Sequence, residues 1–106
     1  MLDLTKLYKD KYYEVRLIDG TELKLKRPTQ AMIEYTIDMA ELENNDKEAV
    51  KSVSNMFCRI LNRNTDNKQF SREDIIEDYD LAVIVYVIKD YFAFWEKEVI
   101  EKVDFQ

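Results

Sequence analysis

The residues with the clearest capacity for chemistry lie in a polar segment of the second half of the chain. Asn62, Asn64, Asp66 and Glu73 stand at positions 1, 3, 5 and 12 of an EF-hand calcium loop. Oxygen atoms at this spacing can surround a calcium ion. However, Asn67 occupies the position at which the motif has glycine, and only two of the four candidate ligands are anionic. These departures favour an ordinary polar loop, so we predict no metal ligand here.

A second candidate is a group of carboxylates: Glu73, Asp74, Glu77, Asp78 and Asp80. Paired carboxylates can act as general acid and base or hold a cation. Acidic residues near the start of a helix also interact favourably with the helix dipole without any further role. We expect the second explanation to hold for this group.

The chain lacks the residues that nucleophilic catalysis and phosphate transfer commonly need. The chain has no histidine, and Cys58 is its one cysteine. A catalytic cysteine needs a base that generates the thiolate, so Cys58 is predicted to be a small buried hydrophobic residue. The lone Gly20 excludes a glycine-rich phosphate loop. We therefore expect a non-enzymatic protein without a cofactor.

The length of the chain and the distribution of its charge further limit the kinds of protein it can be. The 106 residues predict a single domain, with an N-terminal segment over 1–27 and a helical body over 28–106. The segment carries seven Lys/Arg against five Asp/Glu (+2), and the body nine against seventeen (−8). An acidic body disfavours nucleic-acid binding. The first residues do not resemble a signal peptide, no apolar run is long enough to span a bilayer, and one cysteine fits a reducing compartment, so we expect a cytoplasmic protein.

Alternation of apolar and polar residues over 12–26 predicts a β-hairpin. A two-residue turn at Asp19-Gly20 would place the apolar residues of the two strands on opposite faces. A three-residue turn, Ile18-Asp19-Gly20, brings them to one face and puts Gly20 in the left-handed bulge position. The bulged turn is favoured, and it pairs Leu17 with Thr21, Val15 with Leu23 and Tyr13 with Leu25.

Helical periodicity and capping residues predict the rest of the chain. The expected helices cover about 30–43, 46–62, 72–78 and 81–102, with Thr29, Asn45 (with Glu48), Ser71 (with Asp74) and Asp80 at their starts. The β-branched run over 83–88 leaves a strand as the alternative for part of the last element. The predicted fold class is α+β and mainly α: an N-terminal β-hairpin followed by three or four helices, the last one long.

The last predicted helix has more apolar surface than one small core can use. Between Leu81 and Trp95, every residue except Lys89 and Asp90 is apolar. One stripe faces the core in this prediction: Leu81, Ile84, Ile88, Phe92, Trp95 and Val99. A helix that is apolar on several faces is either central or in contact with a partner. We therefore predict a partner-binding surface, made by Val83, Val87, Tyr91 and Phe94.

Three sequence features together resemble a known group of proteins. They are Val-x-Leu-x-Asp-Gly-Thr-x-Leu-x-Leu-x-x-Pro-Thr over 15–29, Phe-Ser-Arg-Glu-Asp-Ile over 70–75, and a loose match to Tyr-Phe-x-Phe-x-x-Glu near the end, which starts at Tyr91 and has Lys97 and then Glu98 at its last position. With an acidic helical body between them, the chain is similar to the tail assembly chaperones of long-tailed (siphovirus-type) phages and prophages of Gram-positive bacteria. The resemblance covers nearly the whole chain.

The resemblance implies a mainly helical, non-enzymatic protein of the host bacterial cytoplasm that oligomerises. Such proteins coat the tape measure protein, help to recruit tail tube protein and leave before the tail is complete. A different function stays open from the residues alone: a small acidic regulatory or inhibitor protein that blocks a basic partner protein. The expected partners are a protein client and further copies of the chain, with neither nucleic acid nor membrane.

Overall fold

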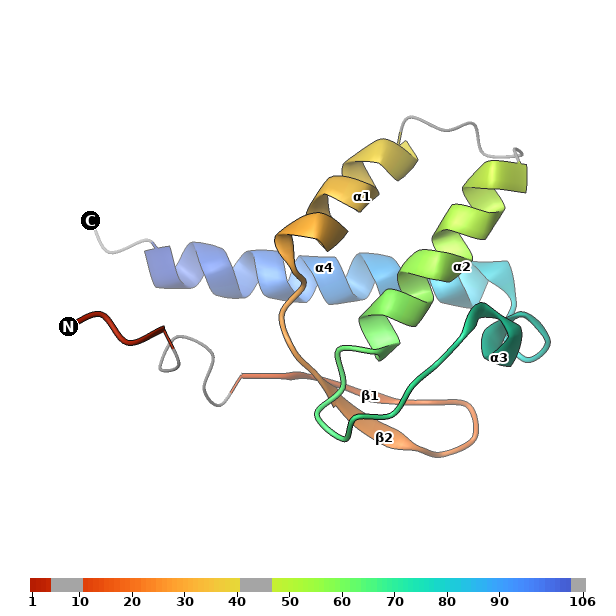
Figure 1. The fold of residues 1–106 in the computed structure, drawn as a ribbon, viewed down its shortest axis with the longest axis horizontal. Coiled ribbons are helices and arrows are strands. Elements are labelled where there is room, and N and C mark those ends of the chain that lie inside the picture. The colour runs from red at the N-terminus through yellow and green to blue at the C-terminus, as the bar shows by residue number, and fades with distance from the viewer. Residues whose placement is uncertain (5–10, 41–46, 104–106) are drawn as a thin grey trace.

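The hairpin and four helices follow one another along the chain in the predicted order. A computed structural model describes residues 1–4, 11–40 and 47–103, and their side chains except over 37–40 and 98–103. The elements are β1 (Tyr13–Arg16), β2 (Glu22–Leu25), α1 (Gln30–Ala40), α2 (Lys47–Leu61), α3 (Arg72–Ile76) and α4 (Leu81–Val103). In Figure 1 the hairpin lies below α1 and α2, and α4 extends behind them. The predicted α+β, mainly helical class is confirmed.

The hairpin has the bulged turn that the apolar pattern predicts. Val15 lies opposite Leu23 and Tyr13 opposite Leu25. The Leu17 N–H donates to the Thr21 carbonyl at 2.7 Å. Gly20 has φ +92°, a conformation that costs a glycine little because it has no Cβ. Asp19 Oδ1 accepts the Thr21 N–H at 2.9 Å, and this hydrogen bond holds the pKa of Asp19 below its usual value.

The free side of β2 is closed by the segment that follows α2. The Lys26 N–H donates to the Arg63 carbonyl at 2.9 Å, and the Thr65 N–H donates to the Lys24 carbonyl at 3.0 Å. Leu25 and Asn64 form an antiparallel bridge between these bonds. The segment therefore acts as a short third strand, which stabilises a hairpin that would be marginal alone.

Three of the predicted helix starts are observed. Thr29 Oγ1 accepts the Met32 N–H at 3.2 Å, and Asp80 Oδ1 accepts the Val83 N–H at 2.9 Å. At α3 the Ser71 N–H and hydroxyl both donate to Asp74 Oδ2, at 2.8 and 3.0 Å. These bonds lower the pKa of Asp74. The predicted cap at Asn45 lies outside the described residues.

The core forms around α2, which contacts α1, α3, α4 and β2. Its apolar side supplies Met56, Phe57, Ile60 and Leu61, all buried as the helical pattern predicts. Cys58 is buried too, and burial raises the pKa of its thiol, which keeps it in the unreactive form. The other elements complete the core with Leu17, Leu23, Leu25, Met32, Ile75, Ile84, Ile88, Tyr91 and Trp95.

Candidate protein-binding surface on the last helix

The whole apolar run over 81–95 is helical, so the alternative of a strand over 83–88 is wrong. The stripe of α4 that enters the core consists of Ile84, Ile88, Tyr91 and Trp95, at helical spacing. The predicted core stripe is correct at three of these positions. It is wrong at Leu81, which is exposed, and Phe92 is only half-buried. The side chain of Val99 lies outside those described.

Tyr91, predicted to contact a partner, is instead enclosed by the protein's own core. Its exposed fraction is 0%, and its hydroxyl donates to the Lys26 carbonyl at 2.5 Å. Its ring meets that of Tyr13 edge to face, with the centroids 5.5 Å apart. Burial raises the pKa of Tyr91 well above its ordinary value. Because its polar tip has a partner at the end of β2, Tyr91 can be buried at little cost, and it leaves the candidate surface.

Phe94 is half-buried because the hairpin covers it. The centroid of the Phe94 ring lies 5.5 Å from that of the Tyr13 ring and 5.0 Å from that of the Trp95 ring. The Tyr13 hydroxyl donates to Asp90 Oδ2 at 2.6 Å, and burial together with this bond raises the pKa of Tyr13. Asp90 interrupts the apolar run because it receives this tyrosine. In the sequence, the feature that could have indicated this contact was the charge of Asp90 within an otherwise apolar run.

At the other end of the run, apolar side chains face solvent. Val83 is 41% exposed and Tyr86, one helical turn further on, is 70% exposed. Val87 is half-buried against the core and lies beside Val83 at i+4. These three residues form what we call the α4 apolar surface. Tyr86 was missed from the sequence, although its place in the apolar run and outside the core stripe could have identified it.

The segment that resembles a calcium loop is held together by hydrogen bonds between two asparagine side chains, those of Asn62 and Asn64, and backbone groups. Asn64 is 3% exposed, and its side-chain oxygen accepts the N–H groups of Asp66 and Lys68, both at 3.0 Å. Its amide group donates to the Leu61 and Lys68 carbonyls at 2.8 and 2.9 Å. Asn62 bonds both backbone groups of Phe70 in the same way. The side-chain oxygens of Asn62 and Asn64, two of the four that the motif would aim at a cation, therefore order the loop.

The carboxylates over 73–80 are exposed, and two of them have a local role. Asp74 and Asp80 accept N–H groups at the starts of α3 and α4. This matches the predicted stabilisation of helix starts. Within the described part of the chain, no three His, Cys, Asp or Glu side chains come together as a metal site.

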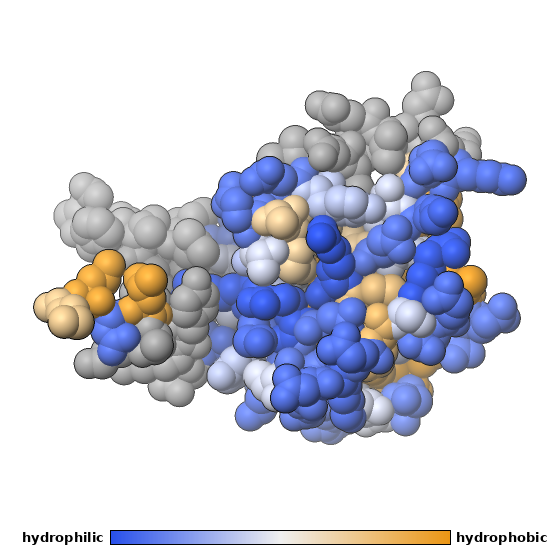
Figure 2. All heavy atoms as spheres, viewed as in Figure 1, coloured by the Kyte–Doolittle hydropathy of each residue, from blue (hydrophilic) through white to orange (hydrophobic). Residues whose placement is uncertain are grey.

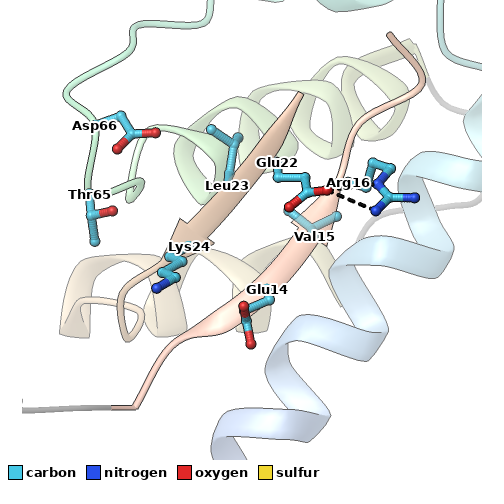
Figure 3. Close-up of a pocket in the computed structure, with 8 residues that line it drawn as sticks. All are labelled: Glu14, Val15, Arg16, Glu22, Leu23, Lys24, Thr65 and Asp66. Carbon is cyan, nitrogen blue, oxygen red and sulfur yellow. Dashed lines mark hydrogen bonds and ion pairs between the residues drawn. The ribbon is translucent and has the colours of Figure 1, made fainter. Parts of the chain in front are cut away.

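The outer face of the hairpin carries a shallow hollow of about 500 Å³ (Figure 3). It is lined by Glu14, Val15, Arg16, Glu22, Leu23, Lys24, Thr65 and Asp66. Arg16 and Glu22 form an ion pair at 2.8 Å, and both side chains are largely exposed. Such pairs contribute little to stability. The lining offers charges of both signs.

The molecule presents mainly hydrophilic residues on the face that carries α1 and α2 (Figure 2). Among the described residues, no helix combines the length and apolar character needed to cross a bilayer. In comparisons with protein families, with curated proteins and with solved structures, the chain has no significant match. The features that bear on function are therefore the exposed surface and the sequence motifs.

Proposed function

We propose that the protein is a non-enzymatic tail assembly chaperone that oligomerises and shields the tape measure protein during phage tail assembly. The observation that carries the proposal is the α4 apolar surface. Val83 and Tyr86 expose a large fraction of their side chains on a helix whose opposite side fills the core. Exposed apolar side chains that lie together on one helix face are typical of contacts with another protein.

The chemistry of the surface fits an apolar, helical segment of a client. Tyr86 supplies an aromatic ring with a polar end, the combination that is common at binding hot spots. Val83 and Val87 line the adjacent helical positions. The partner-binding set is thereby revised from the sequence prediction: Val83 and Val87 stay, Tyr86 joins, and Tyr91 is withdrawn. Phe94 can contribute only the part of its ring that Tyr13 leaves uncovered.

The sequence motifs are the reason for proposing a tape measure protein as the client. The hairpin with its Pro-Thr end, the Ser71 start of α3 and the aromatic residues of α4 are the features that resemble the tail assembly chaperones. Tail tube protein is the second expected partner. The charge of the body, −8 over 28–106, favours a second candidate, an acidic inhibitor of a basic protein.

The proposal predicts a tape measure gene beside the gene for this chain, and co-expression of the two proteins tests it. We expect the chain to keep the tape measure protein soluble and to co-purify with it. A Val83→Asp/Tyr86→Asp variant should lose both effects, whereas a Glu96→Gln variant, changed at an exposed polar position of α4, should keep them. Equal performance of the two variants, or the absence of any such gene neighbour, would contradict the proposal.

Salt separates the two candidate functions. Apolar shielding should persist or strengthen in 1 M NaCl, at which the Debye length is about 3 Å. An acidic inhibitor should release its basic partner under the same conditions. Retention of the client at high salt supports the chaperone, and release supports the inhibitor.

A further inference from the structure

The outer edge of β1 has backbone groups that nothing in the described structure satisfies. The bond from the Leu17 N–H to Thr21 fixes the alternation of the ladder, so that Tyr13 and Val15 also bond to β2. The N–H and C=O groups of Glu14 and Arg16 therefore point away from β2. No hydrogen bond to these groups occurs within the described residues. Both side chains are exposed.

The two edges of the hairpin differ in this respect. Figure 3 shows β2 lying between β1 and the loop that carries Thr65 and Asp66. That loop bonds to the backbone of Lys24 and Lys26. On the other side of β1, α4 runs past the strand and contacts it through the Tyr13 side chain. No strand or loop among the described residues bonds to the outward backbone groups of β1, and an unpaired strand edge of this kind is a template for another strand.

We propose that β1 pairs antiparallel with β1 of a second copy about a two-fold axis, with Val15 opposite Val15. The two hairpins would then form one continuous four-stranded sheet. This inference deepens the proposed function, because it rests on the self-association included there and names the surface that forms it. The α4 apolar surface stays available for the client.

The charges on β1 select this register over its neighbours. The backbone N–H and C=O groups at the free edge of β1 belong to Glu14 and Arg16. These two residues must therefore form the hydrogen-bonded pairs with the second copy. With Val15 on the axis, Glu14 lies opposite Arg16 of the second copy, and the reverse pair forms by symmetry. A shift by two residues in either direction would place Glu14 opposite Glu14 or Arg16 opposite Arg16, and like charges opposite each other destabilise a sheet.

The inner face of the sheet is compatible with the same register. Side chains alternate along a strand, so Tyr13, Val15 and Leu17 share the face that packs on the helices. In the proposed pairing, Val15 meets Val15 and Tyr13 meets Leu17 of the second copy. Both are apolar pairs, and β-branched and aromatic residues are favourable cross-strand neighbours.

Charge reversal tests the pairing in the full chain. Glu14→Arg and Arg16→Glu each place like charges opposite each other twice, and we expect each to raise the dissociation constant for self-association roughly tenfold or more in sedimentation equilibrium. The double variant Glu14→Arg/Arg16→Glu should restore the wild-type value. An equimolar mixture of the two single variants should associate as well, because each strand then opposes its complement.

The mixture also controls for the ion pair between Arg16 and Glu22, which Arg16→Glu breaks. Adding the Glu14→Arg chain cannot repair that intrachain pair, so recovery in the mixture reports contact between copies. A Glu22→Gln variant, which loses the pair but keeps the edge charges, should self-associate like the wild type.

A backbone variant gives an independent measurement. Glu14→Pro removes an N–H that faces outward and leaves the bonds between β1 and β2 in place, so it should abolish self-association without lowering the thermal midpoint of the monomer. If the Glu14 and Arg16 variants self-associate with the same dissociation constant as the wild type, this inference alone is overturned. A wild-type chain that stays monomeric at every concentration would overturn it together with the proposed self-association.

Discussion

The two ends of the apolar run on α4 contain similar residues in opposite environments. At the Tyr91 end, the hairpin covers the helix, and Tyr13 contacts both the Tyr91 and Phe94 rings. At the Val83 end, Val83 and Tyr86 face solvent. Aromatic content alone therefore does not identify the binding surface of this helix. Whether a side chain of this helix is buried depends on the packing neighbours that the rest of the fold supplies and, for a tyrosine, on a hydrogen-bond partner for its hydroxyl.

The largest expected difference between the two ends concerns stability. Tyr91→Ala removes a fully buried ring and should lower the free energy of unfolding by about 3–5 kcal/mol, measured by urea denaturation. Tyr91→Phe keeps the ring and leaves the Lys26 carbonyl unpaired, so about 1 kcal/mol should be lost. A loss below about 1 kcal/mol for Tyr91→Ala would show that this end of α4 is not core.

Alkaline pH should act on the same end. The folded protein holds the pKa of Tyr13 and Tyr91 above the ordinary value of 10.0. The folded state therefore binds protons that the unfolded state has lost, and stability should be complete below pH 10 and fall as the pH rises above it. The fall should be at most about 1.4 kcal/mol per pH unit for each group, and less for Tyr13, which solvent reaches.

Urea titrations between pH 9 and 12 can measure this slope. Tyr91→Phe and Tyr13→Phe should each flatten it, because the replaced side chain no longer titrates. A slope that is unchanged in both variants would contradict the buried environment that we describe for the two hydroxyl groups.

A smaller effect should separate the hairpin contact from the helix itself. Asp90→Ala removes the acceptor of the Tyr13 hydroxyl and should cost about 1 kcal/mol in urea denaturation, because the bond is partly exposed to solvent. In a Tyr13→Phe background the same change should cost nearly nothing, since the bond is already absent. Equal costs in both backgrounds would mean that the pair does not couple the hairpin to α4.

The smallest effect on stability is expected at the Val83 end. Val83→Ser should change the free energy of unfolding by less than about 0.5 kcal/mol, because solvent already reaches this side chain. The same change at Ile84, the adjacent buried position, should cost about 2–4 kcal/mol. Similar costs for Val83→Ser and Ile84→Ser in parallel urea titrations would remove the contrast on which the candidate surface depends.

Local rules were enough to predict most of the fold. The position of Gly20 and the alternation around it fixed the turn and register of the hairpin, and Thr29, Ser71 and Asp80 marked the helix starts. These features depend on residues that are close in sequence. They follow from turn geometry and from the pairing of exposed helix-end N–H groups.

The candidate site was less predictable because it depends on contacts across the whole chain. Tyr13 and Asp90 are separated by 77 positions, and no local pattern indicates that they meet. The same is true of Tyr91 and the carbonyl of Lys26. Helical periodicity assigned Phe92 to the core stripe and Tyr91 to the partner-binding surface, because the contacts between Tyr91 and the hairpin are not visible in the local pattern.

Photo-crosslinking from Tyr86 can show whether the α4 apolar surface contacts the client. A benzoylphenylalanine placed at Tyr86 should crosslink to the tape measure protein in a co-expressed complex, because this position lies at the centre of the α4 apolar surface. The same probe at Glu96, an exposed position ten residues further along α4, should give no adduct. Adducts of equal yield from both positions, or from Glu96 alone, would contradict the account.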